Sequence, residues 1–323
     1  MFATRRYEDE IFNKLHTLLN GDVCRILRRE GNISGNTIAS WATRYSSMES
    51  DIAHATFQTV APAAYFSKPQ KLVVTVHDIL PIFPGNIHDI STRIQWKFTP
   101  SALQKADAII AISNFTRMEL IDHLKINPKI IHVVPQGVDH SIFRPLDKKE
   151  SRQQLGLDQN STYILVASSN QPHKRMDLVK EILLELRSRD SDIKLLKIGY
   201  GDFLNVDGVI NLGWVPESEM PLLYNSADAY LHTSSYEGFG LPILEAMACG
   251  TPTIANNCAS IPEVIGSGNT IDMDSASTIE ICNYTIEKMA SDIDELALSR
   301  SNQFTWEQTA LNTLNVYEEV LKT

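Results

Sequence analysis

Long apolar runs are missing from this sequence of 323 residues. The longest, Leu72–Val76 and Ala106–Ile112, have the length of β-strands, whereas a membrane-spanning helix needs about 18 apolar residues in a row. The opening residues, MFATRRYEDEIF, also lack the apolar core of a secretory signal peptide. We therefore expect neither a transmembrane helix nor secretion, and predict a cytoplasmic protein.

Cysteine is scarce as well, with four residues that form no C-x-x-C pair. They lie mostly in apolar contexts, which favours reduced thiols in a cytosolic protein over a disulfide framework. The four are Cys24, Cys249, Cys258 and Cys282.

Positive charge is too sparse for a typical nucleic-acid binder, because the formal net charge is −10. The imbalance is uneven along the chain. Residues 1–152 carry 19 Lys and Arg against 15 Asp and Glu, whereas residues 153–323 carry 10 against 24. This asymmetry suggests two bodies with different partners, and the alternative is simple solubility charge on the second half.

The length corresponds to about two domains, and 43% apolar residues suffice for large cores. Short β-rich apolar runs alternate with helical patterns, which predicts βαβ units and parallel sheets. We expect strands at 72–76, 108–112, 130–134, 163–167, 193–198, 209–212, 229–232 and 251–255. We expect helices at 115–124, 178–186, 220–224, 241–248, 279–298 and 306–321.

A domain boundary is predicted near Pro145–Gln154, where the stretch PLDKKESRQQ is polar and the charge balance changes sign. Each half then holds a doubly wound sheet. The expected ligand site is the cleft where strand carboxyl ends and helix N-termini gather.

The strongest local signal is the segment from Glu237 to Glu245, EGFGLPILE. A predicted strand leads through a polar loop into a Gly-rich turn and then a helix. Gly238 and Gly240 let backbone amides approach a ligand, and the helix N-terminus suits phosphate. The two carboxylates could bind hydroxyls at opposite ends of an extended ligand. A plain strand–turn–helix with surface glutamates would show the same local pattern.

Several segments together resemble the retaining glycosyltransferases of family 4, which have the GT-B fold. The chain carries E-x7-E, then ACGTP at 248–252 and PEVIG at 262–266. Other stretches match in the right order. They are ADAIIAISNFTRMEL (106–120), IIHVVPQGVDHSIFRP (130–145), LLKIGYG (195–201), GWVPESEMPLLYNSADAYL (213–231) and FTWEQTALNTLNVYEEVL (304–321).

The resemblance implies an α/β protein with two Rossmann-like domains facing across a cleft. Residues 1–147 would form the acceptor-side domain and 148–303 the nucleotide-sugar domain, while 304–323 would form a helix crossing back to the first domain. Family members begin with a strand and a Gly-rich loop, but this sequence begins in TRRYEDEIFNKL, which resembles the following helix. We interpret this as a late start. If the loop is truly missing, cover of the donor phosphates is lost.

The resemblance also implies roles for the E-x7-E segment. Glu245 would bind the ribose hydroxyls of the donor, and Glu237 would contact hydroxyls of its sugar. Amides around Gly238, Phe239, Gly240 and Leu241 would hold the sugar and the proximal phosphate. Ser234 matches a small polar residue of the family, and its alternative role is a loop or helix cap.

Lys174, in SSNQPHKRMDL, matches the family's lysine that neutralises the diphosphate. Such a cation stabilises the charge that develops on the leaving group. The family usually has an Arg six residues earlier, but this sequence has Ser168 there. Arg175 or His173 could substitute for it.

His77, in LVVTVHDILPIFP, follows a predicted buried strand. At that position we expect it to face the cleft, and the resemblance places it against the reacting sugar. Asp78 beside it is expected to orient the loop. The other eight histidines form no metal-like cluster, and we expect most of them at the surface.

Two other enzyme classes fit less well. A Rossmann dehydrogenase is disfavoured because Gly199-Tyr-Gly201 is followed by Leu204 and not by the third glycine. A D-x-D metal site is disfavoured because the pattern occurs three times without a strand-end context, at 190–192, 272–274 and 292–294. We expect no metal and no cofactor. A GT-B epimerase or phosphorylase would share the fold but not the family-4 pattern.

We therefore predict a retaining, metal-independent glycosyltransferase. Its donor would be a GDP- or UDP-linked hexose, and the V-H-D-x-x-P loop favours GDP-mannose. The acceptor would be a glycan or a lipid-linked sugar. Arg25, Arg28 and Arg29 could rest on an anionic membrane at the inner face of the cell, or form an ordinary solvated face. The non-enzymatic alternative is a catalytically impaired nucleotide-sugar-binding or scaffolding protein, favoured by Ser168 and the absent Gly-rich loop.

Overall fold

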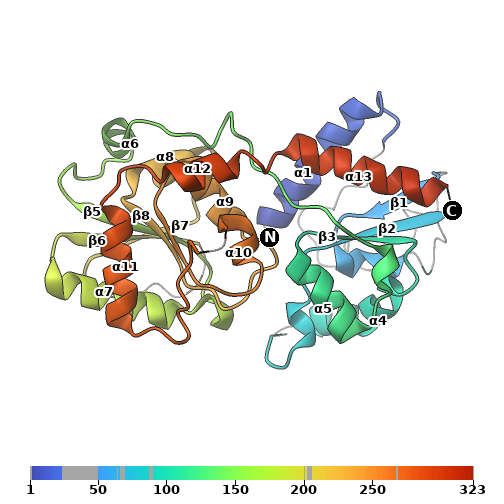
Figure 1. Cartoon of the computed structure of the whole chain (residues 1–323), viewed down its shortest axis with the longest axis horizontal. Coiled ribbons are helices and arrows are strands. Elements are labelled where there is room, and N and C mark those ends of the chain that lie inside the picture. The colour runs from blue at the N-terminus through green and yellow to red at the C-terminus, as the bar shows by residue number, and fades with distance from the viewer. Residues whose placement is uncertain are drawn as a thin grey trace. The chain divides into compact units, whose positions relative to one another are not determined.

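The fold is described from a computed structural model, shown in Figure 1. The structure describes residues 2–23, 50–63, 65, 70–86, 90–199, 201, 206–266 and 268–322. The chain forms two compact units. The first comprises Met1–Gly137 with Trp306–Thr323, and the second comprises Val138–Thr305.

The first unit is built on a parallel sheet with the strand order β1-β2-β3-β4. Its strands are β1 (Ile52–Ala55), β2 (Lys71–Val76), β3 (Ala108–Ala111) and β4 (Ile131–Val133). Its α-helices are α1 (Phe2–Leu18), α4 (Ile90–Leu103), α5 (Asn114–Leu124) and α13 (Trp306–Leu321).

Alternate residues of the central strands bury on opposite faces of this sheet. Val74 and Val76 join a core cluster with residues of α4 and α5. Val73 and Ile110 join the other cluster with Val316 of α13. Because helices cover both faces, the strands are apolar without alternation, which is the pattern that predicted a parallel sheet. The C-terminal helix packs on this sheet through Val316 and Val320.

The second unit is built on a five-stranded parallel sheet with the order β7-β6-β5-β8-β9. Its strands are β5 (Thr162–Ala167), β6 (Ile193–Ile198), β7 (Val209–Gly213), β8 (Ala229–His232) and β9 (Thr253–Ala255). Its α-helices are α6 (Lys148–Gln154), α7 (Met176–Arg189), α8 (Met220–Ser226), α9 (Leu241–Ala248), α10 (Ile261–Ile265), α11 (Thr278–Met289) and α12 (Glu295–Ser301). The order reverses between β5 and β8, as in a doubly wound fold.

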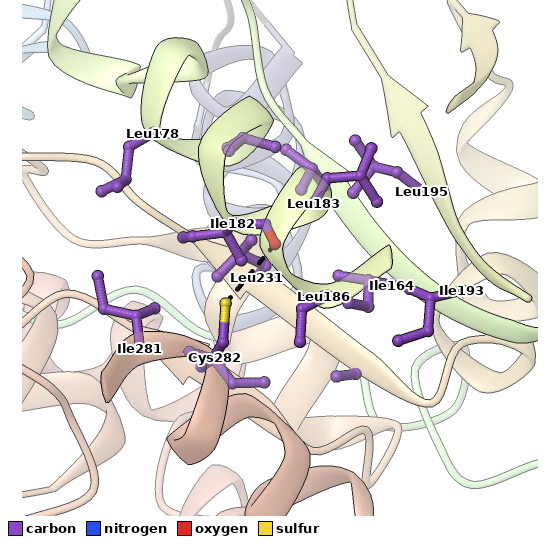
Figure 2. Close-up of a cluster of buried hydrophobic side chains, with 14 of the residues drawn as sticks. Ile164, Leu178, Ile182, Leu183, Leu186, Ile193, Leu195, Leu231, Ile281 and Cys282 are labelled. Carbon is purple, nitrogen blue, oxygen red and sulfur yellow. Dashed lines mark hydrogen bonds between the residues drawn. The ribbon is translucent and has the colours of Figure 1, made fainter. Parts of the chain in front are cut away.

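The core of the second unit lies between this sheet and the helices α7 and α11 (Figure 2). Ile182 of α7 and Ile281 of α11 are fully buried there with Leu231 of β8. Cys282 donates a hydrogen bond from its thiol to the carbonyl of Ile182 at 3.6 Å. Burial raises its pKa to about 11, so the thiol is protonated and behaves as a small core residue.

The structure confirms most of the predicted elements with shifts of a few residues and adds β1, α4, α6 and α10, which the sequence analysis missed. The continuous helix expected over residues 279–298 is wrong. It is divided into α11 and α12, because Asp294 caps a new helix by accepting from the amide of Ala297 at 3.0 Å. The strand expected from Thr251 begins at Thr253, after Pro252, which has no N–H to donate.

The two units divide between Gly137 and Val138, earlier than the boundary expected at 147. The intervening segment is bonded to the second unit. The Leu146 amide donates to the Asn225 side chain at 2.7 Å, and that side chain donates to the Arg144 carbonyl at 3.0 Å. The polar stretch taken as a linker contains α6, which Asp147 caps.

Candidate functional site

The candidate site lies in the second unit at the carboxyl ends of β5 and β8, where the strand order reverses. Parallel strands leave a crevice at such a point, and helix N-termini gather around it. The loop after β5 carries Lys174, and the loop after β8 carries Glu237. Two bonds join these loops: the Ser235 amide donates to the His173 carbonyl, and the Thr233 hydroxyl donates to the Lys174 carbonyl, both at 2.8 Å.

Glu237 is the centre of a charged cluster. Its Oε1 accepts from Lys174 Nζ at 2.6 Å and from His232 Nε2 at 2.8 Å. Burial by itself would favour the neutral acid, but Lys174 and His232 outweigh it and hold the pKa of Glu237 well below its usual range. Glu237 is therefore a carboxylate with two donors on one oxygen.

The hydrogen bonds determine the tautomer of His232, whose side chain is 4% exposed. An ionised carboxylate only accepts, so Nε2 carries the hydrogen toward Glu237. In the neutral ring Nδ1 is then an acceptor, and Tyr230 OH, at 3.1 Å, donates to it. Burial, with nearby Tyr224 and Glu237, raises the pKa of Tyr230 well above its usual value and keeps this donor protonated.

His173 is partly buried beside the same cluster. Burial, followed by the positive charge of Lys174, lowers the pKa of His173 to about 4. It is therefore neutral at physiological pH, and Lys174 carries the positive charge next to Glu237.

Gly240 is the N-cap residue of α9 and has a φ of 103°, in the region that favours glycine. A Cβ there would lie 3.1 Å from Ile243 Cδ1. Phe239 is buried, and its ring packs edge-on against Phe304 at 5.9 Å between centroids. Gly238, Gly240 and Leu241 thus lie where the sequence placed them, before and at the start of the helix.

Glu245 lies farther along α9, where it is 4% exposed. Its Oε2 accepts from Tyr224 OH at 2.9 Å. A buried carboxylate on a tyrosine can still receive a ligand hydroxyl, because it has several lone pairs. Ser234 is also buried, and its carbonyl accepts from the Asn256 amide and the Cys258 thiol, both at 3.1 Å.

The segment after β9 is hydrogen-bonded to the loop that carries Glu237. The Ser260 hydroxyl bridges the carbonyls of Glu237, at 2.8 Å, and Phe239, at 3.1 Å. Beside it, Ala259 has a φ of 50°, which is unfavourable for a residue with a Cβ. The loop is thus held by side chains from a neighbouring strand end.

The structure does not bring Arg175 into this cluster. Its guanidinium bonds Asp274 Oδ1 at 2.7 Å and the Met273 carbonyl at 3.4 Å. The Ser168 hydroxyl donates to the Ser169 carbonyl at 3.1 Å, and its amide donates to the Ile198 carbonyl at 3.0 Å. The Ser168 carbonyl would lie 2.3 Å from a Cβ on Gly199, which explains the glycine there.

His77 lies in the first unit, at the end of β2, and is 8% exposed. Its Nε2 donates to the Thr56 carbonyl at 3.0 Å, so its Nδ1 accepts from the Gln136 amide at 3.1 Å. The rings of Tyr7 and Phe57 pack against it. Both ring nitrogens are thus bonded within the first unit, and the expected role of His77 at the cleft stays a prediction. Asp78 orients the loop by accepting from the Leu80 amide at 3.0 Å.

Sequence reasoning missed His232 and Tyr230, and the expectation of surface histidines fails at His232, which is 4% exposed. His232 is the last residue of β8 and is almost fully buried. Its place at the carboxyl end of a predicted strand was the available signal, the same one that singled out His77. Tyr230 and Ser260 gave no comparable signal, because only the fold brings them to the cluster.

Among the described residues, no three His, Cys, Asp or Glu side chains are grouped as metal ligands would be. Within the described residues no helix is both long and apolar enough to cross a bilayer. Cys24 and Arg25, Arg28 and Arg29 lie outside the described residues.

Comparison with known families matches nearly the whole chain. A family model described as glycosyl transferases group 1 matches residues 147–310, and one described as glycosyltransferase family 4 matches residues 4–142. The chain is 29% identical to the O-antigen chain mannosyltransferase B of Escherichia coli, over 77% of this chain and 70% of that protein. It is 27% identical to a D-inositol 3-phosphate glycosyltransferase of Segniliparus rotundus, over 68% of this chain and about half (53%) of that protein.

Solved structures share the fold at lower identity. Sucrose-phosphate synthase from Thermosynechococcus elongatus gives a TM-score of 0.72 at 18% identity, covering 88% of this chain and 77% of that one. Anabaena HepE, solved with UDP-glucose, gives 0.69 at 19% identity, covering 95% and 88%. These likenesses confirm the predicted GT-B architecture.

Proposed function

Because the chain belongs to the glycosyl transferases group 1, we propose that this glycosyltransferase moves a hexose from a nucleoside-diphosphate sugar to a glycan or lipid-linked acceptor. We further propose that the anomeric configuration is retained and that no metal ion takes part. The observation that carries the proposal is the Lys174–Glu237–His232 cluster at the reversal of the second sheet.

Lys174 is suited to neutralise the diphosphate, because its side chain lies at the carboxyl ends of β5 and β8, bonded to Glu237, and is about 19% exposed. In the structure it is paired with Glu237. When a phosphate pairs with the Lys174 ammonium, the Glu237 carboxylate still has one donor, because His232 remains bonded to it. The second donor therefore avoids the large free-energy cost of leaving an unpaired charge in a poorly solvated site.

Glu237 then presents its other carboxylate oxygen to hydroxyls of the donor sugar. Glu245 is proposed for the ribose hydroxyls, with Tyr224 holding one of its oxygens. The amides at Gly238, Phe239, Gly240 and Leu241 are proposed for the sugar and the proximal phosphate, since α9 begins at Leu241 and its N-terminus favours anions.

In the proposed reaction, the bond between the anomeric carbon and the diphosphate oxygen breaks. The acceptor oxygen bonds the same face of that carbon, and its proton passes to the departing phosphate oxygen. Lys174 stabilises the charge on the leaving group. His77 is proposed to act by position and not as a base, because its Nδ1 already accepts from Gln136.

Two lines of support point to different donors, which differ in both the base and the sugar. The V-H-D-x-x-P loop and the mannosyltransferase relative support GDP-mannose. The HepE structures with UDP-glucose, and with UDP and glucose, support a UDP-sugar. We propose GDP-mannose and treat UDP-sugars as the competitor in the test.

One observation favours a second candidate, a nucleotide-sugar-binding protein with impaired catalysis. The family's usual arginine is replaced by Ser168, and the nearby Arg175 is held by Asp274. Lys174 would then be the single cation near the diphosphate among the described residues of these two loops. Such a protein would bind donor but transfer sugar slowly or not at all.

The test is a thermal-shift panel of GDP, UDP and their sugars on the whole chain, with EDTA in one arm, followed by donor hydrolysis with the best ligand. A ligand that binds the folded state raises the melting temperature by mass action. We expect a shift with GDP-mannose in both arms, lost in Lys174→Ala and kept in Lys180→Ala, an exposed lysine of α7.

The outcomes separate the candidates. A shift with measurable hydrolysis supports the enzyme, and a shift without hydrolysis or transfer supports the binding protein. A larger shift with UDP-sugars overturns the donor assignment. A shift that needs a metal overturns metal independence, and an equal shift in Lys174→Ala overturns the assigned site.

A further inference from the structure

Strand β6 (Ile193–Ile198) carries a lysine that is completely removed from solvent. Lys197 is 0% exposed, although lysine is a residue type that is almost never fully buried unless it is paired. Its register partner on β5 is Val166, and Leu195 precedes it by two residues. Both belong to the core cluster drawn in Figure 2, so the stem of Lys197 lies on the sheet face that packs against α7. An apolar side chain would fill this position without the cost of burying an ammonium.

The partner that the structure gives this ammonium is a neutral carbonyl. Lys197 Nζ donates to the carbonyl of Gly199 at 3.0 Å. Burial lowers the pKa of Lys197, because the charged form has lost its water. A carbonyl offsets part of that loss, and an anion at the same place would offset more of it.

The Gly199 carbonyl lies where the carboxyl ends of three adjacent strands meet. The Gly199 amide donates to the carbonyl of Gly213, the last residue of β7, at 2.8 Å. On the other side, the Ser168 amide donates to the Ile198 carbonyl at 3.0 Å. Ser168 also opens the loop that carries Lys174. That loop therefore starts beside the end of β6, and the buried ammonium lies next to its first residue.

Charge balance at the proposed donor site calls for a second cation. A diphosphate carries more than one negative charge and gains another as its bond to the sugar breaks. Lys174 contributes one positive charge, which it shares with Glu237. The guanidinium of Arg175 is bonded to Asp274, and His173 is neutral. The N-terminus of α9 adds a partial charge of roughly 0.5. These groups leave part of the phosphate charge unbalanced.

We propose that Lys197 supplies a second positive charge for the diphosphate of the donor. This inference rests on the proposed donor site and adds a binding residue from β6 to the two loops described above. A cation in a poorly solvated position acts strongly on an anion, because little water screens the field between them. The diphosphate in turn favours the charged form of the lysine, which offsets the effect of burial on its pKa.

The sheet register offers a way to move this charge by one strand. Lys197 pairs with Val166 of β5. Ser168 continues the ladder through its bond to the Ile198 carbonyl, so side chains 166, 168 and 197 share a face of the sheet. An arginine at position 168 would approach the strand ends from the same face as Lys197. Ser168→Arg is therefore expected to replace a charge that is lost at Lys197.

The test measures binding of GDP and UDP to the whole chain by isothermal titration calorimetry. Lys197→Met keeps the apolar stem and removes the charge, and it should raise the dissociation constant of the better nucleotide by about tenfold or more. The loss should be smaller with the corresponding monophosphate, which carries less charge. Adding Ser168→Arg to Lys197→Met should restore most of the affinity.

The melting temperature without nucleotide separates this role from a structural one. A methionine in place of a buried ammonium should leave the melting temperature equal or raise it. A lysine that serves only the fold predicts the opposite result, which is a lower melting temperature with unchanged nucleotide affinity. That result would overturn the inference.

The matched control is Lys194→Met, which removes a lysine near the other end of β6, where its ammonium lies over the Tyr163 ring. It should keep the wild-type affinity. Unchanged affinity in Lys197→Met, together with a loss in Lys174→Ala, overturns this inference and leaves the proposed donor site intact. An equal loss for diphosphate and monophosphate that Ser168→Arg does not relieve overturns it as well. A wild-type chain that binds neither nucleotide overturns the proposed function, and this inference with it.

Discussion

The two units both place polar side chains inside a parallel-sheet fold, but in different charge states. In the second unit, the cluster at the ends of β5 and β8 is ionised, with Glu237 between Lys174 and His232. In the first unit, a polar chain crosses from helix to sheet to helix. Thr75 bonds Tyr7 at 2.9 Å and His54 at 2.8 Å, and His54 bonds Tyr317 at 2.6 Å.

The difference follows from whether burial comes with a counter-charge. Burial, and then nearby His77, lowers the pKa of His54 to about 3, and burial raises that of Tyr7 above its usual range, so both are neutral. Glu237 is also largely removed from solvent, with a side chain 14% exposed, but its two donors keep it charged. A site in which a phosphate replaces one charged partner needs a carboxylate with a second donor, as Glu237 has. The neutral hydrogen-bonded series of the first unit instead joins β1, β2, α1 and α13.

The largest effect is expected at the charged cluster. Lys174→Ala should lower kcat/KM of sugar transfer by about 100- to 1,000-fold, because the leaving diphosphate loses its stabilising charge. Steady-state transfer or donor hydrolysis measures it. Lys180→Ala, on the exposed side of α7, should retain full activity. Near-normal turnover in Lys174→Ala would show that another group balances the leaving group.

Neutral His54 in the first unit predicts a pH dependence of the free energy of unfolding that the charged Glu237 does not share. Unfolded His54 binds a proton near pH 6.5, whereas the folded residue does so near pH 3. Its contribution to stability is thus complete above pH 6.5 and is lost as the pH falls from 6.5 toward 3. Glu237, with its lowered pKa, loses its contribution only below the usual glutamate range, near pH 4.3.

Chemical unfolding between pH 7 and pH 5 separates these contributions. His54 alone should lower the wild-type stability by about 1–2 kcal/mol over this interval. His54→Gln should be less stable at pH 7 but should fall less on acidification. His173→Gln is the comparison in the second unit, since the pKa of His173 is also lowered, to about 4. An equal slope in His54→Gln and wild type would contradict a buried neutral His54.

A smaller effect is expected from the residue that positions Glu237. His232→Leu should reduce kcat/KM by about tenfold, the ratio for a hydrogen bond to a charged group worth roughly 1.5 kcal/mol. His232→Gln can still donate to the carboxylate and should recover most of the activity. If Gln and Leu are equally impaired although both proteins melt normally, His232 acts by shape and not as a donor.

The smallest effect concerns the segment that supports the charged loop. Ala259→Gly should raise the free energy of unfolding by about 0.5–1 kcal/mol, because a φ of 50° costs less without a Cβ. Thermal unfolding measures the shift. Ala227→Gly, a change of the same type at the end of α8 where φ is −81°, should give no stabilisation. A lower melting temperature in Ala259→Gly would mean that the methyl group contributes more by packing than it costs in strain.

Much of the architecture was predictable because the signals are local. Strands β6 and β8 and helix α9 begin and end at the predicted residues. Their apolar runs and flanking Gly and Pro residues are sufficient signals. Strand β1 was missed because IAHA mixes a polar histidine into four residues, and it is recognisable only beside β2. The break between α11 and α12 depended on one capping aspartate.

The sequence by itself determined the two parallel sheets, the Gly-rich turn before α9 and the residue types available at the strand ends, because neighbouring residues decide them. Only the tertiary structure decided which of those residues meet. Lys174 and Glu237 are 63 positions apart, and His54 and Tyr317 are 263 apart. Whether a buried group is charged depends on such distant partners, since the free energy of burying a charge is set by what surrounds it in space.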